Sequence, residues 1–169
     1  MTGDTHIADQ ITALLPRLHR YGRAVTGNTS DADDLVQATC EKALRSGGPG
    51  QVGVRTDLWL FRIMRNHWLD HVRSAAERRR APEDALEERG DGGLAARQAE
   101  DRLMLERVRD AMRTLKTEHR EVLALVVLEG MSYRDAADTL QVPQGTVMSR
   151  LARARTALAS ALNGKDVQR

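Results

Sequence analysis

Apolar side chains recur every three or four residues through the first 72 residues, which is the spacing of one face of an α-helix. The repeat is interrupted near Gly27 and again at residues 46–50, where glycine and proline disfavour a continuing helix. Thr29, Ser30 and Asp31 follow the first interruption and provide capping signals for the helix after it. The pattern predicts three helices, over residues 7–27, 29–46 and 56–79, that together form one small domain.

The periodic pattern is lost between residues 76 and 99. This stretch combines three consecutive arginines, a proline, several acidic residues and a glycine-rich run, with almost no large apolar residues. Because such a composition buries too little apolar surface to fold, we expect a flexible linker. The sequence therefore predicts an all-α protein with two helical domains, residues 1–75 and 100–169, on either side of a linker at 76–99.

Helical periodicity resumes after residue 100 and ends in a pattern typical of a helix-turn-helix. Ser132 is a favourable N-cap for a short helix over residues 133–140. Gln141 and Val142 then break that helix, and Pro143 suits the entry to the next one. This next helix has one apolar face, formed by Val147, Leu151, Ala154 and Leu158.

The opposite face of this last helix carries the side chains that we expect to contact DNA: Thr146, Ser149, Arg150, Arg153 and, at its flank, Arg155. A short helix, a tight turn and a second helix with an arginine-rich front suit insertion into the major groove. Arginine reads guanine through two hydrogen bonds, but it also binds phosphates without sequence preference. The alternative is that these arginines form only the solvated face of a helical hairpin. Gln141 stands where many such turns have glycine, so a left-handed backbone there would carry a cost.

Composition narrows the class of protein further. Aromatic residues make up 3% of the chain, which fits helices packed through aliphatic contacts, and the net charge is only +2. Arginine outnumbers lysine, which suits phosphate recognition but also results from a GC-rich genome. No apolar run reaches the ~20 residues needed to cross a bilayer, and the first nine residues lack the features of a signal peptide. We therefore expect a cytoplasmic protein without membrane insertion.

Two polar features have simpler interpretations than a metal site. His67 and His71 are four residues apart, a spacing that can chelate a metal, but no third ligand is evident, so we expect a polar stripe that faces nucleic acid. Cys40 is the only cysteine, which excludes an intramolecular disulfide, and its place among apolar positions indicates a core residue. The sequence has no phosphate-binding glycine loop and no recognisable nucleophile–base pair. It therefore predicts neither an enzyme nor a bound cofactor.

Two groups of motifs resemble RNA polymerase sigma factors. Residues 130–137 (GMSYRDAA) and 145–151 (GTVMSRL) resemble region 4 of that family. Residues 31–37 (DADDLVQ) resemble the region 2 helix that binds core polymerase, and residues 59–66 (WLFRIMRN) resemble the segment that opens and reads the −10 element. The two groups occur in the family's order, and the chain leaves no room for other sigma regions. The resemblance is therefore to the small extracytoplasmic-function (ECF) class, over residues 7–162.

The resemblance implies a role for three polar side chains of the second predicted helix. Asp33, Asp34 and Gln37 would form an acidic, polar face against the basic clamp helices of core polymerase. Acidic residues near a helix N-terminus also favour the helix dipole, and the two roles are compatible.

The resemblance also implies that the third predicted helix and the loop before it recognise the −10 element. Arg62 and Arg65 would hold phosphates of the separated strand, and Asn66 would hydrogen-bond a base edge. The loop over residues 46–57 would capture a flipped base, although it is equally explained as a connection between helices.

Three further residues bear on how far this resemblance extends. Trp59 and Trp68 are able to stack on bases, but core packing is our interpretation for Trp68, and the role of Trp59 is left open. Met148 stands where the family often has lysine. The missing charge leaves more of the DNA contact to Arg150 and Arg153.

Together these features predict an ECF sigma factor that binds core RNA polymerase, recognises −35 and −10 promoter elements and starts transcription of a stress regulon. The resemblance implies an anti-sigma factor as the inhibitory partner. Two alternatives remain: a sigma-like decoy that binds a regulator without engaging DNA, and a DNA-binding repressor with an unrelated helical domain. Retention of the arginines and Asn66 argues against the decoy.

Overall fold

The computed structural model describes residues 2–50, 53–78 and 97–164, and these residues form helices and connections without a strand. The all-α prediction is confirmed. The elements are α1 (Thr2–Thr26), α2 (Thr29–Ser46), α3 (Thr56–Arg78), α4 (Arg97–Arg113), α5 (Thr117–Leu123), the π-helical turn η1 (Ala124–Leu128), α6 (Tyr133–Leu140) and α7 (Gln144–Gly164). No helix among the described residues has an apolar stretch long enough to cross a bilayer.

Both ends of the range 76–99 given for the linker are helical, and the end of α3 agrees with the helix predicted over 56–79. Helix α3 continues through Arg78 and α4 begins at Arg97, while the rest of the predicted linker lies outside the described residues. Arginine and alanine, which are frequent at both ends of this range, favour helix and therefore extend the two flanking helices.

Helices α1, α2 and α3 pack around large apolar side chains. Leu18 and Tyr21 of α1 are fully buried with Phe61 of α3, and the Tyr21 and Phe61 rings meet edge to face with centroids 5.4 Å apart. Gly22 lets α1 approach α2 and α3 closely, since a Cβ atom there would lie 3.3 Å from Ala32 Cβ of α2 and 3.0 Å from Met64 Cε of α3. The N-cap of α2 is Asn28, not one of the three residues expected from the sequence: its side chain accepts a hydrogen bond from the Asp31 amide at 2.7 Å.

The helix-turn-helix forms as predicted. Ser132 Oγ accepts a hydrogen bond from the Asp135 amide at 3.0 Å and thereby caps α6. Gln141 ends α6 with φ 53° and ψ 45°, which is the left-handed conformation that the sequence indicated would be costly. Val147, Leu151 and Ala154 are buried and hold α7 against α5 and α6.

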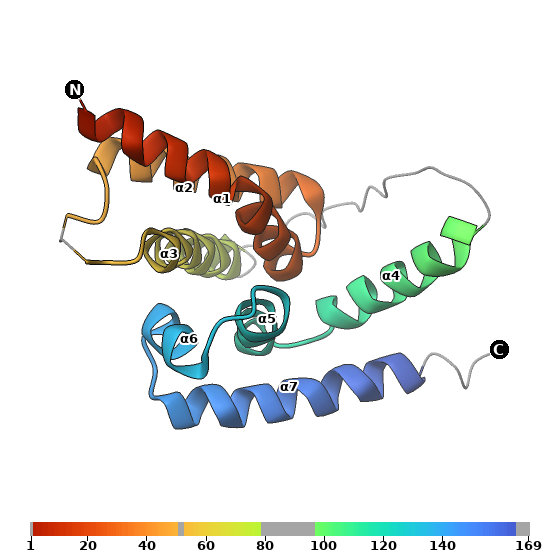
Figure 1. Ribbon diagram of the computed structural model, residues 1–169. Coiled ribbons are helices and arrows are strands. Elements are labelled where there is room, and N and C mark those ends of the chain that lie inside the picture. The colour runs from red at the N-terminus through yellow and green to blue at the C-terminus, as the bar shows by residue number, and fades with distance from the viewer. Residues whose placement is uncertain (1, 51–52, 79–96, 165–169) are drawn as a thin grey trace.

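The N-terminal helices α1–α3 and the C-terminal helices α4–α7 are packed directly on one another. Helix α3 lies along α6, and α1 lies beside α5 and η1 (Figure 1). One contiguous cluster of buried apolar side chains runs through both groups. At the edge of this contact, the Arg113 guanidinium at the end of α4 donates two hydrogen bonds to the Gly27 carbonyl between α1 and α2.

The contact between the two groups also contains a buried carboxylate. Glu121 of α5 is 2% exposed, and its Oε1 lies 3.3 Å from Nε of Arg65 on α3 without the geometry of a hydrogen bond. Burial raises the pKa of Glu121 above its ordinary value, and the nearby Arg65 and Arg150 offset only part of this shift. Burial likewise raises the pKa of the neighbouring Tyr21 hydroxyl.

Replacing Gln141 with glycine should stabilise the protein. A left-handed conformation costs a residue with a Cβ atom about 1–2 kcal/mol, whereas the greater freedom of glycine in the unfolded chain returns about 0.5–1 kcal/mol of that. Thermal unfolding should therefore show a gain of up to about 1 kcal/mol. The control is Gln144→Gly in the first turn of α7, which should lower stability; equal effects of the two changes would contradict this explanation.

The free energy of unfolding of the Glu121→Gln variant, relative to that of the wild type, should increase as the pH rises. The carboxyl has a folded pKa above its ordinary value of 4.5, so the folded chain binds the proton more tightly than the unfolded chain does. As the pH rises through the folded pKa of Glu121, the carboxyl ionises and the folded wild type loses stability. The glutamine variant does not ionise and keeps its stability. Urea unfolding of both proteins at pH 4.5 and 7.5 measures the difference, in which the other titrating groups cancel. A difference in the free energy of unfolding that is the same at both pH values, or that shifts in favour of the wild type at pH 7.5, would contradict a raised pKa for Glu121.

Candidate nucleic-acid interface

The outer side of α7 presents the polar residues predicted for DNA contact. Because successive residues are about 100° apart around a helix, Ser149 and Arg153 lie opposite the buried stripe of Val147, Leu151 and Ala154. Ser149, Arg153 and Arg155 are exposed, and Thr146 is partly exposed. This side of α7 is therefore open to a partner in the structure.

Arg150 differs from the other four residues. Its Nη2 lies 3.1 Å from Oε2 of Glu118 on α5, and its side chain is 22% exposed. Arg150 and Arg155 occupy opposite edges of the polar face, about 140° apart around the helix. Glu118 therefore holds the Arg150 guanidinium toward α5, beside the exposed face rather than at its centre.

The packing of the two groups of helices covers two of the three residues predicted for the −10 element and leaves the third exposed. Arg62 donates from Nη2 to the carbonyl oxygen of Asp138 at 3.0 Å. Arg65 faces the buried Glu121 and its side chain is 12% exposed. Only Asn66 of the three is exposed. The two arginines thus face α5 and α6 of the same chain.

The two tryptophans of α3 pack with the core. Trp68 is 7% exposed and Trp59 is partly buried against the apolar cluster. The core interpretation of Trp68 is confirmed. The described part of the loop at 46–57 begins with Gly47, which ends α2 with φ 68°.

An ion-pair network that the sequence did not reveal connects α1 to the end of η1. The Glu129 carboxylate, at the end of η1, is fully buried and accepts hydrogen bonds from Arg17 Nε at 2.9 Å and Arg20 Nε at 2.7 Å. Arg20 adds a second bond from Nη2 at 3.0 Å, which makes its contact bidentate. The pairs are 109 and 112 residues apart in sequence, so no local pattern connects them.

The network continues from α1 to α6. Arg17 also lies 3.4 Å from Asp57, which accepts a hydrogen bond from Arg55 at 2.8 Å. Arg55 in turn reaches Asp135 of α6 at 2.8 Å. The Arg55 guanidinium beside Asp57 holds the pKa of that carboxyl below its ordinary value, despite partial burial. The positive and negative side chains therefore alternate along the contact between the two groups of helices.

The residues predicted for polymerase binding lie on the outside of α2. Asp33, Asp34 and Gln37 are all exposed. Asp33 Oδ1 lies 3.1 Å from His19 Nδ1, and Gln37 donates a hydrogen bond to Glu41 at 3.0 Å. The three side chains therefore form a polar, accessible face.

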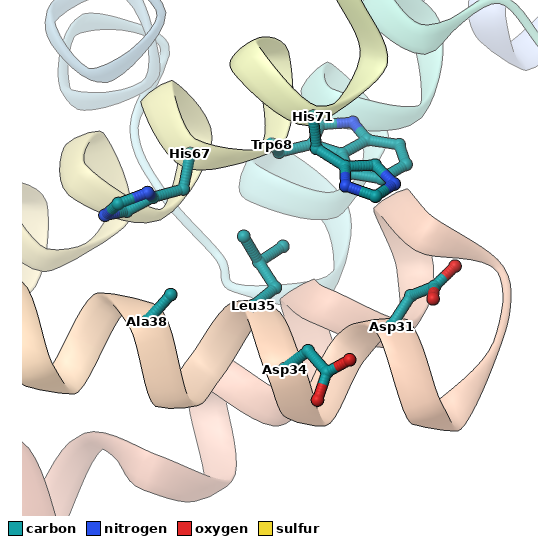
Figure 2. A pocket seen from close by; sticks show the side chains of 7 residues that line it. All are labelled: Asp31, Asp34, Leu35, Ala38, His67, Trp68 and His71. Carbon is teal, nitrogen blue, oxygen red and sulfur yellow. The ribbon is translucent and has the colours of Figure 1, made fainter. Parts of the chain in front are cut away.

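Asp34 also borders a hollow of about 260 Å³ between α2 and α3. Figure 2 shows the carboxylates of Asp31 and Asp34 on the α2 side and the rings of His67, Trp68 and His71 on the α3 side. His71 stacks on Trp68, with ring centroids 5.8 Å apart and 14° between the planes. In the part of the chain that the structure describes, no three histidine, cysteine or acidic side chains gather as metal ligands.

Comparison with solved structures shows the same helical arrangement in sigma factors. The sigma factor RpoE of Bartonella quintana, in complex with the anti-sigma factor NepR, matches with a TM-score of 0.74 and 27% identity over 96% of this chain and 98% of that one. The anti-anti-sigma factor PhyR of the same organism, also in complex with NepR, matches with a TM-score of 0.58 and 16% identity. This second match covers 90% of this chain and 49% of PhyR, and it shows a shared fold alone.

Comparison of sequences assigns the family. Residues 10–78 match the family model for sigma-70 region 2, and residues 105–158 match that for sigma-70 region 4. The ECF RNA polymerase sigma factor EcfG of Rhodopseudomonas palustris is 37% identical over 161 residues, which cover 92% of this chain and 84% of that protein. An exposed polar recognition helix, the paired region models and this relative lead to one conclusion: the chain belongs to the ECF family of RNA polymerase sigma factors.

Proposed function

We propose that this ECF sigma factor binds core RNA polymerase in the cytoplasm and directs initiation at the −35 and −10 elements of a stress regulon. The observation that carries the proposal is the open polar side of α7, where Ser149 and Arg153 project from a helix fixed by its buried stripe. A helix held in this way enters the major groove as a rigid element. The protein supplies promoter recognition, and the polymerase supplies the chemistry.

The proposed −35 contacts differ across α7. Arg153, on the exposed side one turn after Ser149, is placed to bond a guanine edge bidentately. Thr146 lies two turns before Arg153 and nearly in line with it, and Arg155 lies at the flank; both suit phosphate contacts that fix the register. Arg150 has its guanidinium restrained by Glu118, so it contacts the groove from the side.

The proposed −10 contacts use α3. Asn66 is exposed and has both a donor and an acceptor for a base edge. Arg62 and Arg65 offer charged donors to strand phosphates once α5 and α6 no longer cover them.

The proposed protein contacts lie on other faces. Asp33, Asp34 and Gln37 bind basic helices of core polymerase through the outside of α2. An anti-sigma factor is the proposed inhibitor. Its candidate contacts are large apolar side chains exposed on α4 and η1, namely Leu103, Met104, Leu105, Val127 and Leu128.

The decoy is the second candidate, because PhyR has this fold and is an anti-anti-sigma factor. Run-off transcription with purified core enzyme on a genome-wide set of templates separates the two. We expect promoter-specific transcripts from a sigma factor. Absence of transcripts from every template, together with no binding to core polymerase, would favour the decoy.

Arg153→Ala should reduce promoter-specific run-off about tenfold or more, because a bidentate arginine–guanine contact contributes roughly 1–3 kcal/mol. Arg150→Ala should have a smaller effect, since Glu118 already engages that guanidinium. Both variants should bind core polymerase as the wild type does. Arg109→Ala, which removes an exposed charge from α4, is the matched control. A larger loss for Arg150 than for Arg153 would reverse the proposed roles.

The double change Asp33→Asn and Asp34→Asn should weaken binding to core polymerase about fivefold, since exposed ion pairs contribute up to ~1 kcal/mol each. Fluorescence anisotropy of labelled protein titrated with core enzyme measures this. The control is Asp9→Asn with Glu106→Gln, which removes two exposed charges from α1 and α4. Equal weakening by the two double variants would show that net charge, rather than this face, matters.

A further inference from the structure

Six charged side chains that alternate in sign connect the N-terminal helices to the C-terminal helices. We name this chain of contacts the latch; in order, it runs through Arg20, Glu129, Arg17, Asp57, Arg55 and Asp135. Three of its five links cross between the groups: Glu129 pairs with both Arg17 and Arg20, and Arg55 pairs with Asp135. The latch therefore exists only while the two groups of helices are in contact.

Glu129 is the best-held member of the latch. Its side chain is fully buried, and both of its carboxylate oxygens accept hydrogen bonds from α1. Arg17 also lies over the Phe61 ring, 5.4 Å from its centroid, which ties the pair to the core of the N-terminal helices. Separation of the groups would leave the two arginines without this carboxylate.

The latch closes the contact that covers Arg62 and Arg65. In place of strand phosphates these arginines face oxygen atoms of their own chain, the Asp138 carbonyl and the Glu121 carboxylate. The exposed side of α7, by contrast, stays open. The closed arrangement thus obstructs the proposed −10 surface and leaves the proposed −35 surface accessible.

The centre of the contact is less well matched than the latch at its edge. Among the described residues, the buried polar atoms without a hydrogen-bond partner include Tyr21 Oη, Arg62 Nε, Arg65 Nε and Glu121 Oε1. Buried polar groups without partners oppose association. The latch therefore adds charge pairing to a contact in which buried apolar side chains favour association and these polar atoms oppose it.

We propose that the C-terminal helices inhibit the N-terminal helices of the same chain: in the free protein the latch keeps α5 and α6 over Arg62 and Arg65, and the −10 strand binds only after it opens. The inference rests on the proposed function, because it assigns single-stranded promoter DNA to the covered arginines. Acidic and carbonyl oxygens of this chain take the place of phosphate oxygens in the closed form.

The direct test is Glu129→Gln in the full-length protein, assayed against a fluorescein-labelled single-stranded 20-nucleotide DNA of mixed sequence at constant salt. Since apparent affinity scales with the fraction of open protein, we expect binding about tenfold tighter than for the wild type. Glu106→Gln, which removes an exposed carboxylate from α4, controls for net charge and should change little. Equal affinity for the wild type and the Glu129 variant would overturn the proposal.

Two additions make the result specific. Adding Arg62→Ala and Arg65→Ala to the Glu129 variant should remove the gain; if the gain survives, the uncovered surface is not the one proposed. Asp135→Asn removes the third crossing link and should act in the same direction, so that the test does not depend on one variant folding.

A distance measurement tests opening without any nucleic acid. Spin labels at cysteines introduced in place of Lys42 on α2 and Ser160 on α7, in a Cys40→Ala background, report the separation of the groups. Glu129→Gln should lengthen and broaden the distance distribution, and an unchanged distribution would contradict the proposal. Neither assay uses polymerase. Failure of the latch would therefore leave wild-type run-off intact, whereas failure of the proposed function would abolish run-off even if the latch opens.

Discussion

A carboxylate removed from water loses hydration worth several kcal/mol and keeps its charge only where strong hydrogen bonds replace that hydration. Glu129 meets this condition through Arg17 and Arg20, both of which belong to α1. The position of η1 relative to α1 follows from this requirement. Helices α5 and α6, which flank η1 in the chain, are in consequence placed against α1 and α3 (Figure 1).

The recognition helix depends on a different interaction. Val147, Leu151 and Ala154 bury one side of α7 against its own group of helices, so the orientation of Arg153 does not require the N-terminal helices at all. Apolar packing thus presents the proposed −35 surface in any arrangement of the two groups. Charge pairing governs the proposed −10 surface, because the same contact that satisfies Glu129 covers Arg62 and Arg65.

The features that depend on local apolar packing could be predicted from the sequence, and those that depend on charge pairing between distant residues could not. The helix-turn-helix was predictable because its determinants are local: the Ser132 cap, the break at Gln141 and the apolar spacing all act within a few residues. The polar character of Arg62 and Arg65 was equally visible. What lies opposite them was not, because Asp138 and Glu121 approach from more than 50 residues away along the chain.

The latch shows the same limit more strongly. Arg17, Arg20 and Glu129 are ordinary charged residues on helical patterns, and only the folded chain shows that the carboxylate is buried between them. The start of α4 was misplaced for a smaller reason: charged, alanine-rich sequence favours helix even where apolar periodicity has ceased.

In the proposed mechanism, Arg62 and Arg65 first pair with their own chain and then with the promoter strand. The most direct measurement is the distance between α2 and α7 in the doubly spin-labelled wild-type protein, free and after addition of core RNA polymerase. We expect a short, narrow distribution for the free protein and a longer one on the polymerase. The same short distance in both states would contradict the proposed mechanism, since polymerase would then bind the protein with Arg62 and Arg65 still covered.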